Sequence, residues 1–195
     1  MMEENIFITS YTEQNIETIV KHKYFAVFLD IQAKRYYLDS KPILWKNLPQ
    51  VDGMSGTYFH LITVTASEMS TYCCPNKIIH CDRHFSYNPL MGPEYAEKDK
   101  RSICGHRIQC LPLFFKTMTK LDNLIWKEDR STQNGKKHRI HILNQSDKYL
   151  IVIELRNNGN LLFWTAYPVD RGRISDLKRR YKKHKPVSSH NIMVI

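Results

Sequence analysis

The sequence predicts an α+β fold in which a mainly antiparallel sheet has helices packed on one face. Strand-sized apolar runs fill the second half of the chain, and an Asn-Gly pair joins two of them, which is the strongest short-range signal for a β-hairpin. Helical spacing of apolar residues is confined to a few short stretches. With 195 residues the chain is long enough for one domain with a substantial core, which we place over 1–195.

The first part of the chain, 1–50, predicts a helix followed by strands. A short amphipathic helix begins at Thr12 and carries Ile16, Ile19 and Val20 on one face. The apolar runs that follow predict strands at 24–29, at 35–38 and, beyond this part, at 58–64.

Proline and glycine interrupt the region 67–105, which has no sustained period and predicts an irregular insertion. Periodicity returns over 106–185, the predicted core. This core begins with a helix whose first turn tolerates Pro112, and it ends with a basic helix that Pro186 stops. Three strands are predicted between the helices, at 139–143, Tyr149–Leu155 and 161–169, and the first helix has a core-facing stripe of Leu111, Phe114, Phe115, Met118 and Leu121.

The hairpin predicts which face of the sheet belongs to the core. A turn centred on Asn158-Gly159 gives one wholly apolar face and turns Phe163 to the other face. Ile140 and Ile142 of the preceding strand join the apolar face by alternation. The cross-strand pairs predicted on the apolar face are Ile153 with Trp164, Leu155 with Leu162, and Ile151 with Ala166.

The second face gathers groups that carry acid–base chemistry. A carboxylate, an imidazole and a guanidinium suit metal-independent RNA cleavage: a base removes the proton of the ribose 2′-hydroxyl, an acid protonates the leaving 5′-oxygen, and a cation stabilises the phosphorane. Histidine suits either proton transfer because its pKa lies near neutrality. The alternative is an ordinary solvated face, since a register slip of one residue would scramble the set. The candidate catalytic residues are Arg139, His141, Glu154, Thr165 and Tyr167.

The chain is strongly basic, with 29 Lys and Arg against 19 Asp and Glu and a net charge of +10, and such an excess attracts polyanions. From Arg171 to Lys185 there are eight Lys or Arg and one acid. Ile174, Leu177 and Tyr181 form a narrow apolar stripe, which predicts a docked helix whose basic outer face contacts phosphates. A merely solvated face is the alternative.

Several segments, taken in order over about 58–181, resemble a known family. They are Tyr58-Phe59-His60-Leu61-Ile62-Thr63, Arg107-Ile108 at a helix start, Trp126, Arg139-Ile140-His141-Ile142, Tyr149-Leu150-Ile151-Val152-Ile153, Thr165-Ala166-Tyr167-Pro168-Val169 and a basic helix. Their order resembles the phage-associated branch of the nucleases that share the barnase, EndoU, colicin-nuclease and RelE-like (BECR) fold. The resemblance implies a RelE/barnase-like core and a metal-independent endoribonuclease, often a toxin. It nominates Arg139, Thr165 and Tyr167, with Arg107 and His60 as further candidates.

Cysteine and histidine, the preferred ligands of zinc, crowd the stretch 73–110. Their spacing matches no standard zinc finger, because there is no Cys-x-x-Cys and two of the cysteines are adjacent. We therefore favour buried thiols with surface histidines, and we expect no metal and no cofactor. The residues concerned are Cys73, Cys74, His80, Cys81, His84, Cys104, His106 and Cys110.

These observations together favour a cytoplasmic ribonuclease, a toxin or an effector in phage–host conflict, acting on single-stranded or transfer RNA and open to inhibition by an acidic antitoxin or immunity protein. The acidic first residues do not match a secretory signal, and no apolar run is long enough to span a bilayer, so we expect no membrane association. Two alternatives stay open: a non-catalytic RNA- or DNA-binding module, and a protein whose basic face meets an acidic partner. The candidate substrate-binding residues are His60, Arg107, Arg156, Arg171, Arg173, Lys178 and Arg179.

Overall fold

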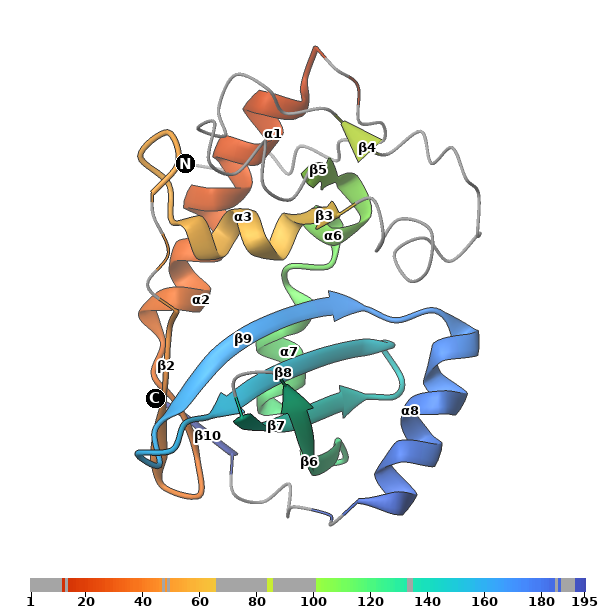
Figure 1. The fold of residues 1–195 in the computed structure, drawn as a ribbon. Helices are drawn as coiled ribbons and strands as arrows, with labels where there is room; N and C mark the ends of the chain where they lie inside the picture. Colours follow the sequence, from red (N-terminus) through yellow and green to blue (C-terminus); the bar gives the residue numbers. More distant parts are fainter. Residues whose placement is uncertain are drawn as a thin grey trace.

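The computed structural model describes residues 12, 14–46, 48, 50–65, 84–85, 101–132, 135–184, 186 and 192–195, without the side chains of 84–85, 130–132, 135–137 and 171. A curled seven-stranded sheet occupies the lower half of the view in Figure 1. Every neighbouring pair in it is antiparallel except β2 and β9. The strand order is β10 (Ile192–Val194), β1 (Tyr36–Leu38), β2 (Lys41–Leu44), β9 (Leu161–Pro168), β8 (Tyr149–Leu155), β7 (Gly135–Asn144) and β6 (Leu124–Thr132).

The remaining elements comprise helices and a small three-stranded sheet in the order β3-β5-β4. Most of them lie above the large sheet in Figure 1. In the ranges given above, no helix is long and apolar enough to cross a membrane. The bounds of these helices and small-sheet strands are α1 Ile16–Lys23, the π-helix η1 Tyr24–Phe28, α2 Leu29–Ala33, α3 Gly56–Ile62, β3 Thr63–Thr65, β4 His84–Phe85, β5 Arg101–Cys104, α6 Gly105–Gln109, α7 Leu113–Thr119 and α8 Arg171–Lys183.

The first helix is confirmed, because α1 buries Ile16, Ile19 and Val20. The strand predicted at 24–29 is wrong: the chain continues as η1 and α2. Tyr24, Phe28 and Ile31 are buried while Phe25 is 65% exposed, so burial follows a helical period of three to four residues. Aromatic and β-branched residues favour strands locally, and packing against the core overrides that preference here.

The strand predicted at 58–64 is also wrong over most of its length, because Gly56–Ile62 forms α3 and only Thr63–Thr65 forms a strand. Ser55 caps the helix, its Oγ accepting from the backbone N of Thr57 at 3.3 Å. Nearly every side chain of α3 is buried, so the sequence lacks the polar side that marks a surface helix.

The second half of the chain matches its prediction more closely. β8 has the predicted bounds, and β7 and β9 cover the other two predicted strands. The strand β6 was not predicted. The helix predicted after Leu111 ends at Thr119, so Leu121 lies beyond it and is 65% exposed; Phe115 is exposed too, and neither belongs to the core.

The predicted register between β8 and β9 is correct far from the hairpin turn and wrong near it. Ile151 pairs with Ala166 as predicted, but Ile153 pairs with Phe163 because a β-bulge interrupts the ladder between Val152 and Ile153. The bulge gives β9 one extra residue, Trp164. Phe163 therefore lies in the core with Ile151 and Ile153, while Trp164 packs on the opposite face of the sheet.

Helices cover both faces of the large sheet, so the prediction that they share one face is wrong. On one face, Phe114 and Met118 of α7 pack with the core side chains of β7, β8 and β9. On the other, α8 packs through its predicted apolar stripe of Ile174, Leu177 and Tyr181. The stripe meets apolar side chains of β6, β7 and β8, namely Trp126, Leu143, Leu150 and Val152.

Candidate nucleic-acid interface

Polar and aromatic side chains gather on the face of the sheet opposite α7, and we call this set the charged face. Arg139 of β7 lies directly opposite Glu154 of β8. His141 and Thr165 lie in the next row across the sheet, and Tyr167 follows along β9. The structure thus places the five candidate catalytic residues on one side of the sheet. The charged face comprises Glu128, Arg139, His141, Glu154, Trp164, Thr165 and Tyr167.

Trp164 is the centre of this face, and its position depends on the bulge. The guanidinium carbon of Arg139 lies 4.9 Å from the centre of its ring, and Nζ of Lys46 lies 4.5 Å from it. Lys46 follows β2, so these two cations reach Trp164 from different parts of the chain. Each is within the distance at which a cation is attracted to an indole ring. A half-buried aromatic ring beside two cations is suited to a nucleic-acid base with its phosphate.

Glu154 lies within this face rather than on its surface. The residue is 4% exposed, and its Oε1 lies 2.8 Å from Nε of Arg156, which follows β8. Its Oε2 is buried, without a hydrogen-bond partner in the part of the chain that the structure describes. Arg139 sits across the ladder from it. The Glu154 side chain therefore lies close to Arg156 and on the same face of the sheet as Arg139.

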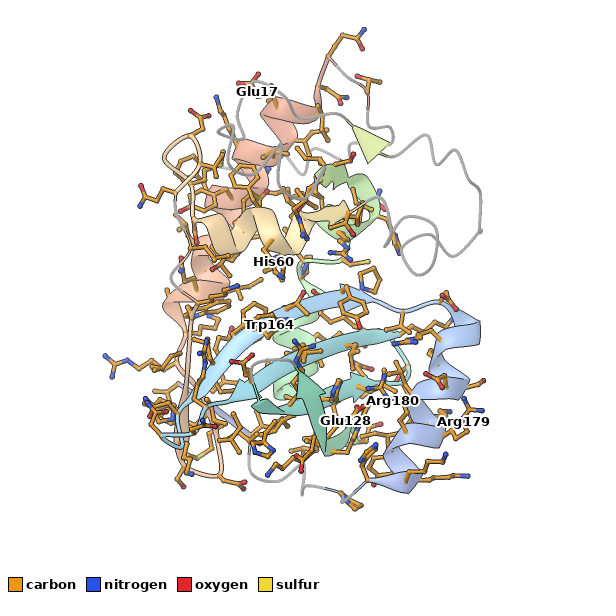
Figure 2. The ribbon with its side chains drawn as sticks, in the orientation of Figure 1. Glu17, His60, Glu128, Trp164, Arg179 and Arg180 are labelled. Carbon is orange, nitrogen blue, oxygen red and sulfur yellow. The ribbon has the colours of Figure 1, made fainter. Side chains whose placement is uncertain are left out.

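His141 is also 4% exposed. Its imidazole stacks on the indole of Trp126, with ring centres 4.8 Å apart and planes 11° from parallel. Nε2 lies 3.3 Å from Oε2 of Glu128, and the same oxygen accepts a hydrogen bond from Arg180 of α8. Figure 2 labels Glu128 and Arg180 where α8 meets the sheet. Glu128 therefore connects His141 on the sheet with Arg180 on α8.

A second group of cations lies in the layer formed by α3, β5 and α6, and two of them donate hydrogen bonds to Thr63. Arg107 is buried and donates from Nη1 to the carbonyl oxygen of Thr63 at 2.6 Å. Nε of Arg101 donates to Oγ1 of Thr63 at 2.8 Å. Burial, and then the charges of Arg101, Lys46 and Arg107, lower the pKa of His60 to about 3. The imidazole of His60 is therefore neutral at physiological pH.

Two cations connect this layer with the charged face. The guanidinium carbon of Arg107 lies 5.6 Å from the ring centre of Tyr167, and Lys46 contacts Trp164 while its charge acts on His60. Figure 2 shows His60 on the side of α3 that faces the sheet, across from Trp164 on β9. The structure therefore brings His60 and Arg107 together with Arg139, Trp164 and Tyr167.

The remaining candidates lie on α8 or near the hairpin turn. Arg179 donates to Oδ1 of Asp176 at 2.7 Å, and Nη1 of Arg173 lies 3.4 Å from Oδ2 of the same carboxylate. The hydrogen bond from Arg179 is the main cause that lowers the pKa of Asp176. Lys178 is exposed, as is the paired Arg156, and the side chain of Arg171 lies outside the described residues.

Sequence reasoning missed Lys46, Arg101 and Trp164 as members of the site. Trp164 was assigned to the core because the bulge was not foreseen. Lys46 and Arg101 lie far from the hairpin in sequence, and only their tertiary contacts place them at the site. Glu128 and Arg180 were also missed, because they meet only through a tertiary contact between β6 and α8.

Neither a metal centre nor a known family defines this site. Among the residues that the structure describes, no three His, Cys, Asp or Glu lie close enough to hold a metal ion. Cys104 and Cys110 are buried, with Sγ of Cys110 4.0 Å from His106; Cys73, Cys74, His80 and Cys81 lie outside the described residues. Comparison with protein-family models, curated proteins and solved structures finds no match to this chain.

Proposed function

We propose that the chain is a metal-independent endoribonuclease that binds single-stranded RNA on the charged face. The observation that carries the proposal is the cluster around Trp164, where Arg139 and Lys46 reach one indole from separate parts of the chain. Aromatic rings among cations are what a protein needs to hold unpaired bases together with their phosphates.

The described side chains suggest how RNA lies on this surface. Trp164 and Tyr167 offer rings on which bases stack. Arg139 and Lys46, beside the ring of Trp164, neutralise the phosphates between the bases. The hydroxyl of Thr165, half-buried between these groups along β9, is placed to donate to a phosphate oxygen or to a base.

The reaction class comes from the order of segments that resembles the RelE- and barnase-like nucleases. The ribose 2′-oxygen loses its proton and forms a bond to the adjacent phosphorus, the bond from phosphorus to the 5′-oxygen breaks, and a 2′,3′-cyclic phosphate results. The clustered guanidinium groups stabilise the charge that builds on the phosphorane. Glu154 and His141 are 4% exposed each, so we assign them positioning roles beneath Arg139 and α8.

The test is incubation of the purified chain with single-stranded RNA, transfer RNA and total RNA in the presence of EDTA. We expect cleavage that survives EDTA and leaves 2′,3′-cyclic phosphate ends. If Lys46, Arg101 and Arg139 each contact a phosphate, the logarithm of the affinity should fall with the logarithm of salt concentration with a slope of about −2. Cleavage that needs a metal ion, or RNA that neither binds nor breaks, would refute the proposal.

The burial of His141 and Glu154 also favours a second candidate, a non-catalytic RNA-binding module. This candidate uses the same rings and cations but has no proton carrier at the surface of the sheet. It predicts that RNA shifts on a gel, with the salt dependence given above, and stays intact. An acidic inhibitor protein would bind the same cations, and competition with RNA would detect it.

A further inference from the structure

The outward side of α8 carries cations and no aromatic ring. Within the described part of this helix, the exposed residues are four cations, one serine and one glycine, with no acid and no apolar side chain among them. Figure 2 shows Arg179 on the outer side of α8 and Arg180 on the side toward the sheet. The exposed residues are Gly172, Ser175, Lys178, Arg179, Lys182 and Lys183.

Three of these cations are available to a ligand. Arg179 is paired with Asp176, but no side-chain hydrogen bond or ion pair with the described residues involves Lys178, Lys182 or Lys183. Residues four apart lie on the same side of a helix, about 6 Å apart along its axis, so Lys178 and Lys182 are neighbours. Lys183 follows on the same outer side. We call these three residues the lysine row. Charges of this kind attract phosphates through the release of counterions.

The contacts of α8 fix the lysine row relative to the charged face. Leu177 is fully buried in the apolar cluster between the helix and the sheet, and Arg180 donates a hydrogen bond to Glu128 of β6. The rings of Trp164 and Tyr167 pack against the same apolar cluster. In Figure 1, α8 follows β9 and stands beside the sheet. The lysine row and the two rings therefore lie on one side of the sheet, in a fixed relation to each other.

These two surfaces suit different forms of RNA. Unpaired bases need aromatic platforms, which the charged face provides in Trp164 and Tyr167. A duplex keeps its bases inside and is held mostly through its phosphates and 2′-hydroxyl groups, for which cations without rings suffice. We propose that the lysine row binds the backbone of an RNA duplex that adjoins the single-stranded segment on the charged face. The inference rests on the proposed function, and it assigns as substrate class an RNA in which a stem passes into unpaired nucleotides.

The salt dependence of binding measures the contribution of the lysine row. Each duplex phosphate that a lysine neutralises steepens the slope of the logarithm of affinity against the logarithm of salt concentration by about 0.9. Three lysines therefore add about −2 to −3 to the slope of about −2 expected for the single strand alone. Between about 200 and 50 mM salt, the affinity advantage of a stem-bearing RNA over the single strand should accordingly grow by about 15- to 60-fold.

The test compares labelled 2′-O-methyl probes by fluorescence anisotropy, because these probes lack the hydroxyl that attacks phosphorus. One probe is an oligouridine of about ten nucleotides, and two others carry the same oligouridine with a hairpin stem of about twelve base pairs at its 5′ or its 3′ end. We expect at least one stem-bearing probe to bind the wild type more tightly than the oligouridine, with the steeper salt slope. The triple variant Lys178→Gln, Lys182→Gln, Lys183→Gln should lose this advantage and keep the wild-type affinity for the oligouridine.

Two further variants make the comparison specific. Lys182→Gln alone should lower the added slope by about 0.9, and glutamine has nearly the same helix propensity as lysine, so α8 should stay folded. The matched control Lys23→Gln, Arg35→Gln, Lys41→Gln also removes three positive charges, but from α1, β2 and the residue before β1, which lie far from α8 in Figure 1. This control should keep the stem advantage of the wild type.

The possible results separate the inference from the proposed function. A stem that adds no affinity, or an advantage that survives the substitutions on α8, overturns the inference and leaves single-strand binding intact. Equal weakening of the oligouridine and the stem-bearing probes also overturns it, because α8 would then contact the single strand. The expected stem advantage with a 2′-hydroxyl RNA that is never cut supports the duplex site and refutes the ribonuclease. Probes that do not bind at all overturn both.

Discussion

Replacing Trp164 by leucine removes the ring on which two cations converge. Lys46 and Arg139 lie 4.5 and 4.9 Å from the ring centre, each within cation–π range. Such a contact contributes about 0.5–1 kcal/mol at an exposed site and about 2 kcal/mol when desolvated. Because Trp164 is half-buried, the two contacts together should contribute about 1–3 kcal/mol to the free energy of unfolding, which Trp164→Leu would lose.

The same substitution should weaken RNA binding by a separate amount. Stacking of one base on an aromatic ring contributes about 1–3 kcal/mol, which corresponds to a roughly 5- to 150-fold change in affinity. Leucine keeps most of the apolar bulk but offers no π-face to a base. We therefore expect Trp164→Leu to fold, to be modestly less stable and to bind single-stranded RNA at least about fivefold more weakly.

Urea denaturation gives the stability change, and fluorescence anisotropy with a labelled 2′-O-methyl oligouridine gives the affinity. The matched control is Phe115→Leu, because Phe115 is exposed on α7 and Nζ of Lys34 lies 5.1 Å from its ring centre. The control should lose one similar contact without a change in affinity. An unchanged affinity in Trp164→Leu, or an equal loss in Phe115→Leu, would refute the reasoning.

Three further predictions concern the fold. Leu177→Ala should lower the free energy of unfolding by about 2–5 kcal/mol, since Leu177 is fully buried between α8 and the sheet; a loss under about 1 kcal/mol in urea denaturation would contradict this docking. A double-mutant cycle of Arg180→Gln and Glu128→Gln should give a coupling energy of about 1–2 kcal/mol, because their side chains are only 16% and 13% exposed; additive effects would show that the pair does not hold α8. Burial raises the pKa of Cys110 to about 12, so its thiol should resist alkylation at about pH 8 until the protein is denatured, as peptide mapping by mass spectrometry would show; alkylation of the native protein at the rate of a free thiol would contradict this.

The hairpin of β8 and β9 shows how far alternation alone can predict a sheet. The bounds of β8 and the pair Ile151–Ala166 follow from the apolar pattern and the Asn-Gly turn. The extra residue in β9 does not follow from this pattern, because Phe163 and Trp164 are both bulky and aromatic and either could face the core. The bulge exchanges Phe163 and Trp164, which moves the most useful aromatic ring from the predicted core to the charged face.

The errors in the first half of the chain have a common cause. The residues of α3 that favour strands locally are packed on several sides, and the exposed positions of η1 carry the apolar Phe25 and Ala26. Neither segment therefore shows a period of two or a polar face in the sequence. Only the resulting helices place His60 on the side of α3 that faces β9 (Figure 2). The sequence could therefore suggest His60 through a resemblance, while its cationic surroundings required the tertiary structure.

The most direct test of the central claim compares two arginine variants in an RNA cleavage assay with EDTA. Arg139→Gln removes the guanidinium beside Trp164, whereas Arg35→Gln changes an exposed arginine beside β1 that takes no part in the site. If the charged face cleaves RNA, Arg139→Gln should lower the single-turnover rate by about 10²–10³-fold with unchanged cyclic ends in the residual product, and Arg35→Gln should match the wild type. Equal rates in all three proteins, or no cleavage by the wild type, would contradict the account.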